Sequence, residues 1–213
     1  MKILALSDQV EPFIYSLDLK SHLADVDMVV SCGDLPSKYL EFVITVLNVP
    51  LVYVPGNHDV DQFSVPGGIP IDGRTIDLEG VRLLGIGGSQ RYKPRGRHQY
   101  TDSEMAIRIL PHYPGLIANR LRFGRGVDLL VTHAPPFGIH DGQDLAHIGF
   151  RPFRRLMDVA RPSLLIHGHM HALRNLEPTV TRYHDTTVCN IYPYRILHRA
   201  PDGSWDITRQ ETA

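Results

Sequence analysis

Side chains that commonly bind metal ions stand in five short segments, each at the end of a predicted strand. The segments deliver Asp8, Asp34, Asn57 with His58, His133, and His169 with His171. A two-metal centre needs oxygen and nitrogen donors aimed at ions about 3.5–4 Å apart, with one carboxylate able to bridge them. The residue types and their order allow such a centre. The sequence therefore predicts a site that holds two divalent ions.

The segment Gly-His-Met-His at residues 168–171 is the most specific of these signals. Residues two positions apart share one face only in an extended or turn conformation. The rings of His169 and His171 can then reach one centre, one ring on each ion, whereas His167 would point to the opposite side and into the core. Each remaining segment has an ordinary explanation when taken alone, such as a turn at Asp34 or a buried polar residue at His133. Only their combination favours metal binding.

The first half of the chain alternates apolar strands with short helices. Strands are predicted at residues 2–7, 27–32 and 51–54, and helices at residues 16–24 and 37–48. This alternation favours parallel pairing and an α/β layer fold. In such sheets ligands bind outside the carboxyl ends of the strands. Asp8, Asp34 and Asn57 would therefore face one crevice.

The second half of the chain predicts a second sheet with its own helices. Residues 60–71 are rich in Gly and Pro and predict a loop, and residues 74–78 and 81–86 predict a hairpin. Thr101 and Glu104 have capping-box spacing, which predicts a helix that begins near Asp102. Further strands are predicted at 127–131 and 163–166 and a helix at 150–160, with an antiparallel ending at 179–183, 186–191, 194–198 and 205–208. Two central sheets flanked by helices accommodate all these elements.

Length and composition are those of a globular protein. The chain has 213 residues, of which 43% are hydrophobic and 21% charged, and its net charge is −1. We expect one domain over residues 1–213, with no membrane partner and no electrostatic demand for nucleic acid. Cys32 and Cys189 are too few for a disulfide framework, and the apolar run before Asp8 is too short for a signal peptide. These features predict a cytoplasmic protein.

The ordered set of motifs resembles the calcineurin-like metallophosphoesterase superfamily. Its pattern is D-x-H, G-D, G-N-H-D or G-N-H-E, a lone His and G-H-x-H. The corresponding elements here are Asp8, Gly33-Asp34, Gly56-Asn57-His58-Asp59, His133 and Gly168-His169-Met170-His171. The resemblance covers roughly residues 1–195 and implies a four-layer α/β/β/α sandwich, with two mixed sheets between helices.

The resemblance also implies a role for each motif residue. Asp34 would bridge the two metals, Asp8 and His171 would bind the first metal, and Asn57, His133 and His169 would bind the second. His58 would stabilise transition-state charge or protonate the leaving group, and Asp59 would orient His58. A metal-bound hydroxide would attack phosphorus in line. Such donors suit Mn²⁺ or Fe²⁺, with Zn²⁺ as an alternative at the second position.

Val10 departs from the pattern, because the family's D-x-H motif has a histidine at that position. Valine has no donor atom, so the first metal loses a protein ligand. Water or substrate oxygen could fill the gap, Gln9 or Glu11 could replace the histidine, or only the second position could hold metal. We expect a two-metal site whose first position is weak.

Two loops carry candidate substrate-binding residues. Residues 91–98 include Arg91, Arg97 and His98, and this loop is either a phosphate- or base-binding lid or a solvated charged loop. His140 and His147 follow His133 and would contact the phosphate or the leaving group, or merely cap the following helix together with Asp144.

The residues thus predict a metal-dependent phosphoesterase, either a phosphatase or a phosphodiesterase. A small substrate such as a nucleotide is favoured, because the chain has no separate recognition module. The alternative is a degenerate scaffold that binds other proteins, and Val10 motivates it. A nuclease is the third option, although the near-neutral charge argues against binding a long polyanion.

Overall fold

Alternate side chains of the first strand, β1 (Lys2–Leu6), face two different cores. Ile3 and Ala5 belong to a buried cluster between two sheets, whereas Leu4 and Leu6 belong to a cluster beneath helices. A strand that is covered on both faces is apolar at nearly every position, which explains the apolar run that opens the chain. The computed structural model of the protein describes residues 1–60, 62–171 and 178–208.

Within the described residues, the first sheet contains six strands in the order β14-β13-β1-β2-β3-β4. Besides β1, these are β2 (Met28–Ser31), β3 (Leu51–Tyr53), β4 (Ile69–Pro70), β13 (Tyr194–Arg199) and β14 (Trp205–Thr208). Strands β1 to β4 run parallel, whereas β13 pairs antiparallel with β1 and β14 with β13. The carboxyl ends of β1, β2 and β3 therefore lie at the same edge of the sheet.

The second sheet, over the same described ranges, also has six strands, in the order β11-β12-β10-β9-β6-β5. They are β5 (Arg74–Leu78), β6 (Val81–Ile86), β9 (Leu129–Thr132), β10 (Leu164–His167), β11 (Val180–Tyr183) and β12 (Thr186–Asn190). β6, β9, β10 and β12 are parallel, and the two edge strands are antiparallel to their neighbours. A short parallel pair, β7 (Ser89–Gln90) and β8 (Gln99–Tyr100), stands apart.

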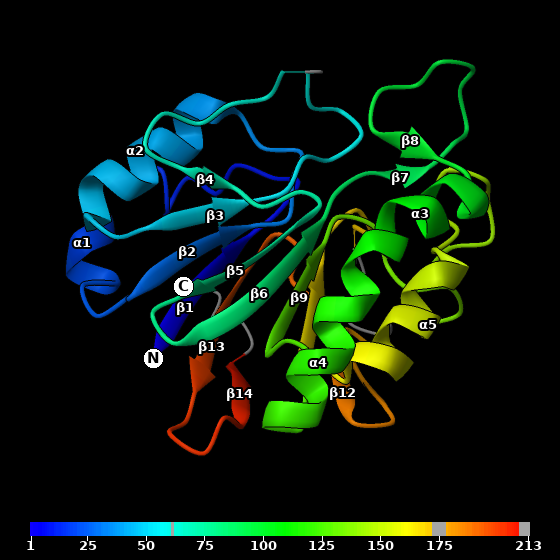
Figure 1. The fold of residues 1–213 in the computed structure, drawn as a ribbon. Helices are drawn as coiled ribbons and strands as arrows, with labels where there is room; N and C mark the ends of the chain where they lie inside the picture. The colour runs from blue at the N-terminus through cyan, green and yellow to red at the C-terminus, as the bar shows by residue number, and fades with distance from the viewer. Residues whose placement is uncertain (61, 172–177, 209–213) are drawn as a thin grey trace.

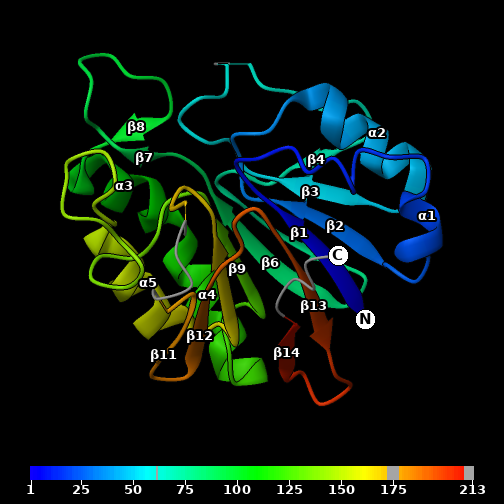
Figure 2. The same cartoon turned by 180° about the vertical axis from the view of Figure 1, so that it is seen from behind.

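Helices cover the outer face of each sheet, so the fold is the expected four-layer α/β/β/α sandwich (Figures 1 and 2). α1 (Leu19–His22) and α2 (Ser37–Leu47) pack on the first sheet. α3 (Asp102–Ile109), α4 (Tyr113–Phe123) and α5 (Arg151–Ala160) pack on the second. A 3-10 turn, Leu110–His112, joins α3 to α4.

Most predicted elements are confirmed, with differences that have local causes. The 74–86 hairpin is antiparallel, and the capping box of Thr101 and Glu104 begins α3. The helix predicted at 16–24 is only the single turn Leu19–His22, too short for an isolated helix to be stable without packing. The loop predicted at 60–71 includes the two-residue strand β4. No element was predicted for residues 113–123, where helix α4 begins with Pro114 in its first turn, a position at which proline is tolerated.

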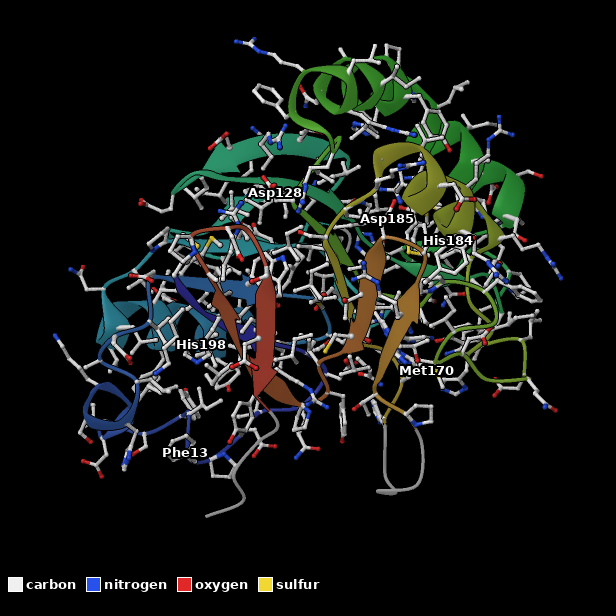
Figure 3. The ribbon with its side chains drawn as sticks, turned by 90° about the horizontal axis from the view of Figure 1, so that it is seen from below. Phe13, Asp128, Met170, His184, Asp185 and His198 are labelled. Atoms are coloured by element: carbon white, nitrogen blue, oxygen red, sulfur yellow. The ribbon has the colours of Figure 1, made fainter. Side chains whose placement is uncertain are left out.

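A buried carboxylate joins the two sheets at the end opposite the carboxyl ends of the parallel strands (Figure 3). Asp128 precedes β9 and lies 3.3 Å from Arg82 Nε and 3.4 Å from an Arg199 guanidinium nitrogen. Arg82 belongs to the second sheet and Arg199 to the first. Among the described helices, none is long and apolar enough to cross a membrane.

Candidate metal centre

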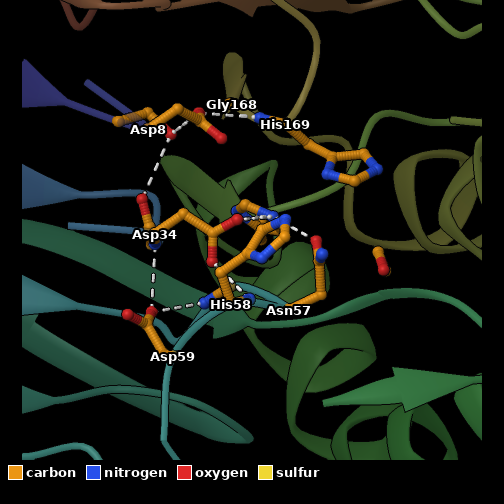
Figure 4. A network of polar contacts seen from close by, with 12 residues as sticks. Asp8, Asp34, Asn57, His58, Asp59, Gly168 and His169 are labelled. Carbon is orange, nitrogen blue, oxygen red and sulfur yellow. Dashed lines mark hydrogen bonds and ion pairs between the residues drawn. The ribbon is translucent and has the colours of Figure 1, made fainter. Parts of the chain in front are cut away.

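The candidate ligands follow strand ends of both sheets, and the sheets direct these ends at one cavity (Figure 4). Asp8, Asp34 and Asn57 follow β1, β2 and β3 of the first sheet, and His133, His169 and His171 follow β9 and β10 of the second. The cavity has a volume of about 200 Å³ and is lined by Asp8, Asp34, His58, His147, His169 and His171. Asn57 and His133 are buried beside it.

The tightest group of donors is Asp34, His133 and His169, each of which offers one donor atom within 4.8 Å of the others. His133 Nε2 lies 3.4 Å from Asp34 Oδ2 and 3.0 Å from Asn57 Oδ1. Asn57 turns this oxygen inward because its Nδ2 donates a hydrogen bond to the hydroxyl of Tyr92, at 3.1 Å. The structure thus brings together the donors expected for the second metal with the expected bridging carboxylate.

The lone pairs of these groups converge. His133 Nδ1 lies 2.7 Å from the carbonyl oxygen of Cys32, which can only accept, so Nδ1 carries a proton. The Nε2 atom of a neutral His133 then presents a lone pair to Asp34 Oδ2 and Asn57 Oδ1, which are also acceptors. Three buried acceptors that face one another repel unless a cation lies among them. This cation is either a proton on His133 or a metal ion.

The electrostatics of the metal-free site follow from this geometry. Burial alone would lower the pKa of His133, but the charge of Asp34 raises it to about 9. Burial alone would raise the pKa of Asp34, and the charge and hydrogen bond of His133 lower it to about 2. Burial and the charge of His133 lower the pKa of His169 to about 4. These pKa values favour a proton on His133 Nε2, at the point where a metal ion would bind.

The histidines are held by backbone acceptors. His169 Nε2 lies 2.8 Å from the carbonyl oxygen of Ala146, so this nitrogen donates and Nδ1 remains available to a metal. The N–H of His169 donates to Asp8 Oδ2 at 2.9 Å, and the Ser7 hydroxyl donates to the same oxygen. These bonds fix the loop of His169 against the end of β1.

The donors expected for the first metal are more loosely arranged. His171 Nε2 lies 3.7 Å from Asp8 Oδ1, and the His171 ring stacks on Tyr192 with centroids 4.5 Å apart. The side chain of His171 is 53% exposed, whereas that of Asp8 is 2% exposed. Val10 packs against the apolar cluster beneath α1 and α2. Residue 10 therefore supplies no ligand to the first metal, although the family pattern has a histidine there.

The two residues expected as substitutes, Gln9 and Glu11, bind each other. Gln9 Nε2 donates to Glu11 Oε1 at 2.8 Å, and Gln9 Oε1 accepts from the Tyr192 hydroxyl at 2.5 Å. Neither side chain is among the described residues that line the cavity. Their role as extra ligands stays a prediction, and it would require these hydrogen bonds to break.

Three ligand candidates adopt the left-handed backbone conformation, with φ of 64° at Asp8, 57° at Asp34 and 64° at His169. This conformation is unfavourable for residues that have a side chain, and it is found disproportionately at functional sites. It turns each side chain out of line with its strand. The unfavourable backbone conformation at these three positions is therefore consistent with a functional role for their side chains.

The loops after β2 and β3 touch through two glycines. A Cβ on Gly33 would meet the backbone of Pro55 and Gly56 at 2.8 Å, and one on Gly56 would meet the ring of His133 at 2.7 Å as well as the Asp34 carboxylate. Only glycine permits this approach. The glycines of the Gly-Asp and Gly-Asn motifs thus let the two loops place their ligands side by side.

Asp59 and His58 complete the same loop. Asp59 Oδ2 accepts from the N–H of Asp34 at 3.0 Å and of Gly56 at 2.8 Å, and the N–H of His58 donates to Asp34 Oδ1 at 2.8 Å. Asp59 therefore fixes the backbone of the ligand loops. Its expected role in orienting the His58 ring stays a prediction. The side chain of His58 is exposed and borders the cavity.

The expected substrate-binding residues divide into two groups. His147 lines the cavity, with its ring centroid 5.3 Å from that of His169 and its Nδ1 2.8 Å from Asp144. The others do not line the cavity as far as the structure describes it. Arg91 forms an ion pair with Glu104 at 2.8 Å, and Arg97 is exposed. His98 Nε2 lies 3.1 Å from the carbonyl oxygen of Val60. His140 forms hydrogen bonds with His167 and Thr181. Substrate contact by these four residues stays a prediction.

Several contributors were not assigned to the site from the sequence. The carbonyl groups of Cys32 and Ala146 bind ligand histidines, and carbonyls have no sequence signature. Tyr192 stacks on a ligand candidate that is distant along the chain. The hydroxyl of Tyr92 orients Asn57, which lies 35 positions away along the chain.

Comparisons with known proteins bear on the family and the fold of this chain. A family model described as calcineurin-like phosphoesterase matches residues 1–173. The uncharacterized protein MJ1162 of Methanocaldococcus jannaschii is 25% identical over 167 residues, which cover 71% of this chain and 72% of that protein. The crystal structure of TT1561 of Thermus thermophilus has a TM-score of 0.62 at 15% identity and 98% coverage of both chains. Another crystal structure has a TM-score of 0.67 at 14% identity and the same coverage. At these identities the structural matches bear on the fold alone.

Proposed function

Because the chain belongs to the calcineurin-like phosphoesterase family, we propose that it is a metal-dependent hydrolase of a small phosphate mono- or diester. The observation that carries this proposal is the convergence of His133 Nε2, Asn57 Oδ1 and Asp34 Oδ2 on one point beside a cavity. An arrangement of buried acceptors that requires a cation fits a metal ligand set. The donors therefore fit the ions that the family implies.

We propose that Asp34 would be shared between two ions. Asn57, His133 and His169 would hold the second ion, and Asp8 and His171 would hold the first. The mix of oxygen and nitrogen donors favours Mn²⁺ or Fe²⁺, with Zn²⁺ as the alternative. The first position is the weaker one, because Val10 offers no donor and His171 is half exposed.

The chain's own groups would act on a phosphate that enters the cavity. Bound divalent ions supply charge neutralisation for phosphoryl oxygens and lower the pKa of water. The exposed ring of His58 borders the cavity, where it can donate a proton to the departing ester oxygen. His147 borders the same cavity and can donate a hydrogen bond to a phosphoryl oxygen. Asp59 keeps the loops of Asp34 and Asn57 in register while the substrate binds.

The size of the metal cavity bears on the kind of substrate. A cavity of about 200 Å³ suits a phosphate group, which favours a small substrate over a long nucleic acid. Cys32 and Cys189 are both free, as expected for a cytoplasmic protein. The second candidate function is a scaffold that binds another protein, and the missing donor at Val10 is the observation that favours it.

Turnover of model esters tests the proposal. Chelator-stripped protein is resupplied with Mn²⁺, Fe²⁺ or Zn²⁺ and assayed with p-nitrophenyl phosphate and bis-p-nitrophenyl phosphate. We expect metal-dependent hydrolysis, with a loss of at least about 100-fold in Asp34→Asn and in His58→Ala. The preferred ester separates a phosphatase from a phosphodiesterase. Metal bound without turnover of either ester would favour the scaffold.

Metal content tests the weak first position in the same preparations. Val10→His restores an imidazole donor, so we expect its metal content to rise towards two ions per chain at a metal concentration where the parent protein holds fewer. Val10→Ala is the matched control and should leave the content unchanged. Equal content in all three proteins would show that Val10 does not weaken the first position.

A further inference from the structure

A shallow apolar groove lies beside the metal cavity. It has a volume of about 380 Å³, which is the lower end of the range for small-molecule sites. Its lining residues are Asp34, Leu35, Pro36, Ser37, His58, Asp59, Val60 and Phe63. Four of these side chains are apolar, and they come from the loops that follow β2 and β3.

The groove and the metal cavity share two residues, Asp34 and His58. A molecule whose phosphate lies in the cavity can therefore extend past His58 into the groove. In that orientation the ester bond to be broken lies beside the His58 ring. The group that enters the groove is then the leaving group.

The groove is formed before any ligand binds. Leu35 is 1% exposed, and the Phe63 ring packs edge-on against Tyr53 with centroids 5.5 Å apart. The Tyr53 hydroxyl accepts from the N–H of Val65 at 3.3 Å, which fixes the turn that follows Phe63. Val60 is 55% exposed and forms the rim. Rigid walls lower the entropic cost of binding a flat group.

Two of the polar groups that line the groove already have partners. The Ser37 hydroxyl donates to the Ser64 carbonyl at 2.7 Å, and Asp59 Oδ2 accepts from two backbone N–H groups. An aromatic ring can bury its faces against the accessible apolar side chains of Phe63, Pro36 and Val60.

We propose that this groove binds an aromatic ring carried by the leaving group of the phosphoester substrate, and this inference rests on the proposed function. In the reaction a water oxygen bonds to phosphorus and the water gives up one proton to solvent, while the bond between phosphorus and the ester oxygen breaks. His58 gives a proton to that oxygen and regains one from solvent, and the product, a phenol or a nucleoside, is released from the groove. The aromatic part of the substrate thus contributes to binding and to the orientation of the ester.

Two non-hydrolysable ligands test the inference on the Mn²⁺-loaded full chain. Phenylphosphonate and methylphosphonate share a headgroup and differ only in the ring. Calorimetry measures their binding, and inhibition of ester hydrolysis measures it independently. We expect phenylphosphonate to bind at least about tenfold more tightly, as burial of a ring predicts. A nucleoside 5′-phosphonate, compared with the same pair, separates a nucleoside from a simple aryl group as the ring's source.

Variants of groove residues test whether the groove causes the tighter binding of phenylphosphonate. Phe63→Ala removes a wall, and Val60→Asn makes the exposed rim polar with less risk to folding; each should reduce the preference for phenylphosphonate to about threefold or less. Phe123→Ala is the matched control, because Phe123 is 51% exposed on α4 and outside the groove. Equal affinity for the two phosphonates, or a preference that survives both groove variants, would overturn the inference.

The proposed function and this inference can fail separately. Ester hydrolysis without tighter binding of phenylphosphonate would support the proposed hydrolase activity and contradict the proposal that the groove binds an aromatic ring. A phenyl preference that the groove variants abolish, in a protein that turns over neither ester, would support the groove as a binding site while removing the hydrolase.

Discussion

His133 is the residue on which the site depends most. Its Nδ1 is committed to the Cys32 carbonyl, and its Nε2 faces Asp34 and Asn57. The ring is completely buried, so water cannot separate these acceptors. The raised pKa of His133 favours a proton among them, and a metal ion that binds through Nε2 must displace that proton.

Metal binding should therefore release a proton from His133. The pKa of His133 is raised to about 9, so the ring is protonated at pH 7.5 and must lose about one proton when metal binds. The pKa of His169 is lowered to about 4, so that ring is already neutral. Calorimetry of Mn²⁺ binding in buffers of different ionisation enthalpy measures the release. We expect the number of protons released to fall by about half a proton between pH 7.5 and pH 9, because half of the His133 rings are already neutral at a pH equal to the pKa. A release that is constant across this range would contradict the assignment.

At the scale of elements, the site is made by loops that follow strand ends and by the contacts between those loops. The loops after β2 and β3 approach so closely that a side chain at Gly33 or Gly56 would displace them. Asp59 then bonds both loops through Oδ2. The contact between these two loops therefore sets the distance between Asp34 and Asn57.

Gly56→Ala tests whether the close contact between the two loops controls metal binding. The new methyl group would meet the ring of His133 at 2.7 Å and the Asp34 carboxylate, so the loop must shift. We expect Mn²⁺ affinity to fall at least about tenfold and the free energy of unfolding to fall by about 1–3 kcal/mol.

Gly115→Ala is the matched control. Gly115 lies in helix α4, and a Cβ there would meet nothing within 4 Å. This variant should bind Mn²⁺ like the parent protein and should be as stable or slightly more stable. Unfolding by urea and metal titration measure both variants, and normal metal affinity in Gly56→Ala would show that the loop contact does not control the site.

At the scale of the whole molecule, the site bridges the two sheets. Asp8, Asp34 and Asn57 come from the first sheet, and His133, His169 and His171 come from the second. At the opposite end, Asp128 pairs with an arginine from each sheet. Between these ends lies a cluster of buried apolar residues from both sheets. This shared core supports our proposal that the chain forms one domain.

A metal ion held by both sheets should stabilise the whole fold. Ions that bind only the folded state add about 2.7 kcal/mol at 100 times their Kd, which corresponds to a rise in Tm of about 5–10 °C for a chain of this size. Differential scanning calorimetry of stripped and Mn²⁺-loaded protein measures the shift. Asp34→Asn is the control and should show a smaller rise. An equal rise in parent and variant would place the stabilising metal elsewhere.

The far end of the molecule holds a larger cavity that has no part in this chemistry. It has a volume of about 600 Å³ and lies between α5 and the turn that joins β11 to β12, where Figure 3 labels His184 and Asp185. This turn is at the amino end of β12, so the cavity opens away from the ligand-bearing strand ends. Size alone therefore does not identify the site.

The sequence by itself determined the local part of this protein. Apolar runs that end in Asp8, Asp34 and Asn57 require buried parallel strands, and parallel strands place their carboxyl ends at one edge. The histidine pair at residues 169 and 171 was recognisable because its spacing is local. The alternation of elements favoured parallel pairing, which the paired strands confirm, whereas the four-layer order was implied by the family resemblance.

The tertiary structure alone decided how the ligands face one another. His133 meets Asn57 across 76 positions of the chain, and it is held by a carbonyl 101 positions away. The stacking of Tyr192 on His171, the bond between Gln9 and Glu11, and the apolar groove beside His58 likewise depend on side-chain directions. Side-chain directions are set by packing between the two sheets, and backbone carbonyls are the same in every residue. Neither leaves a pattern in the order of amino acids.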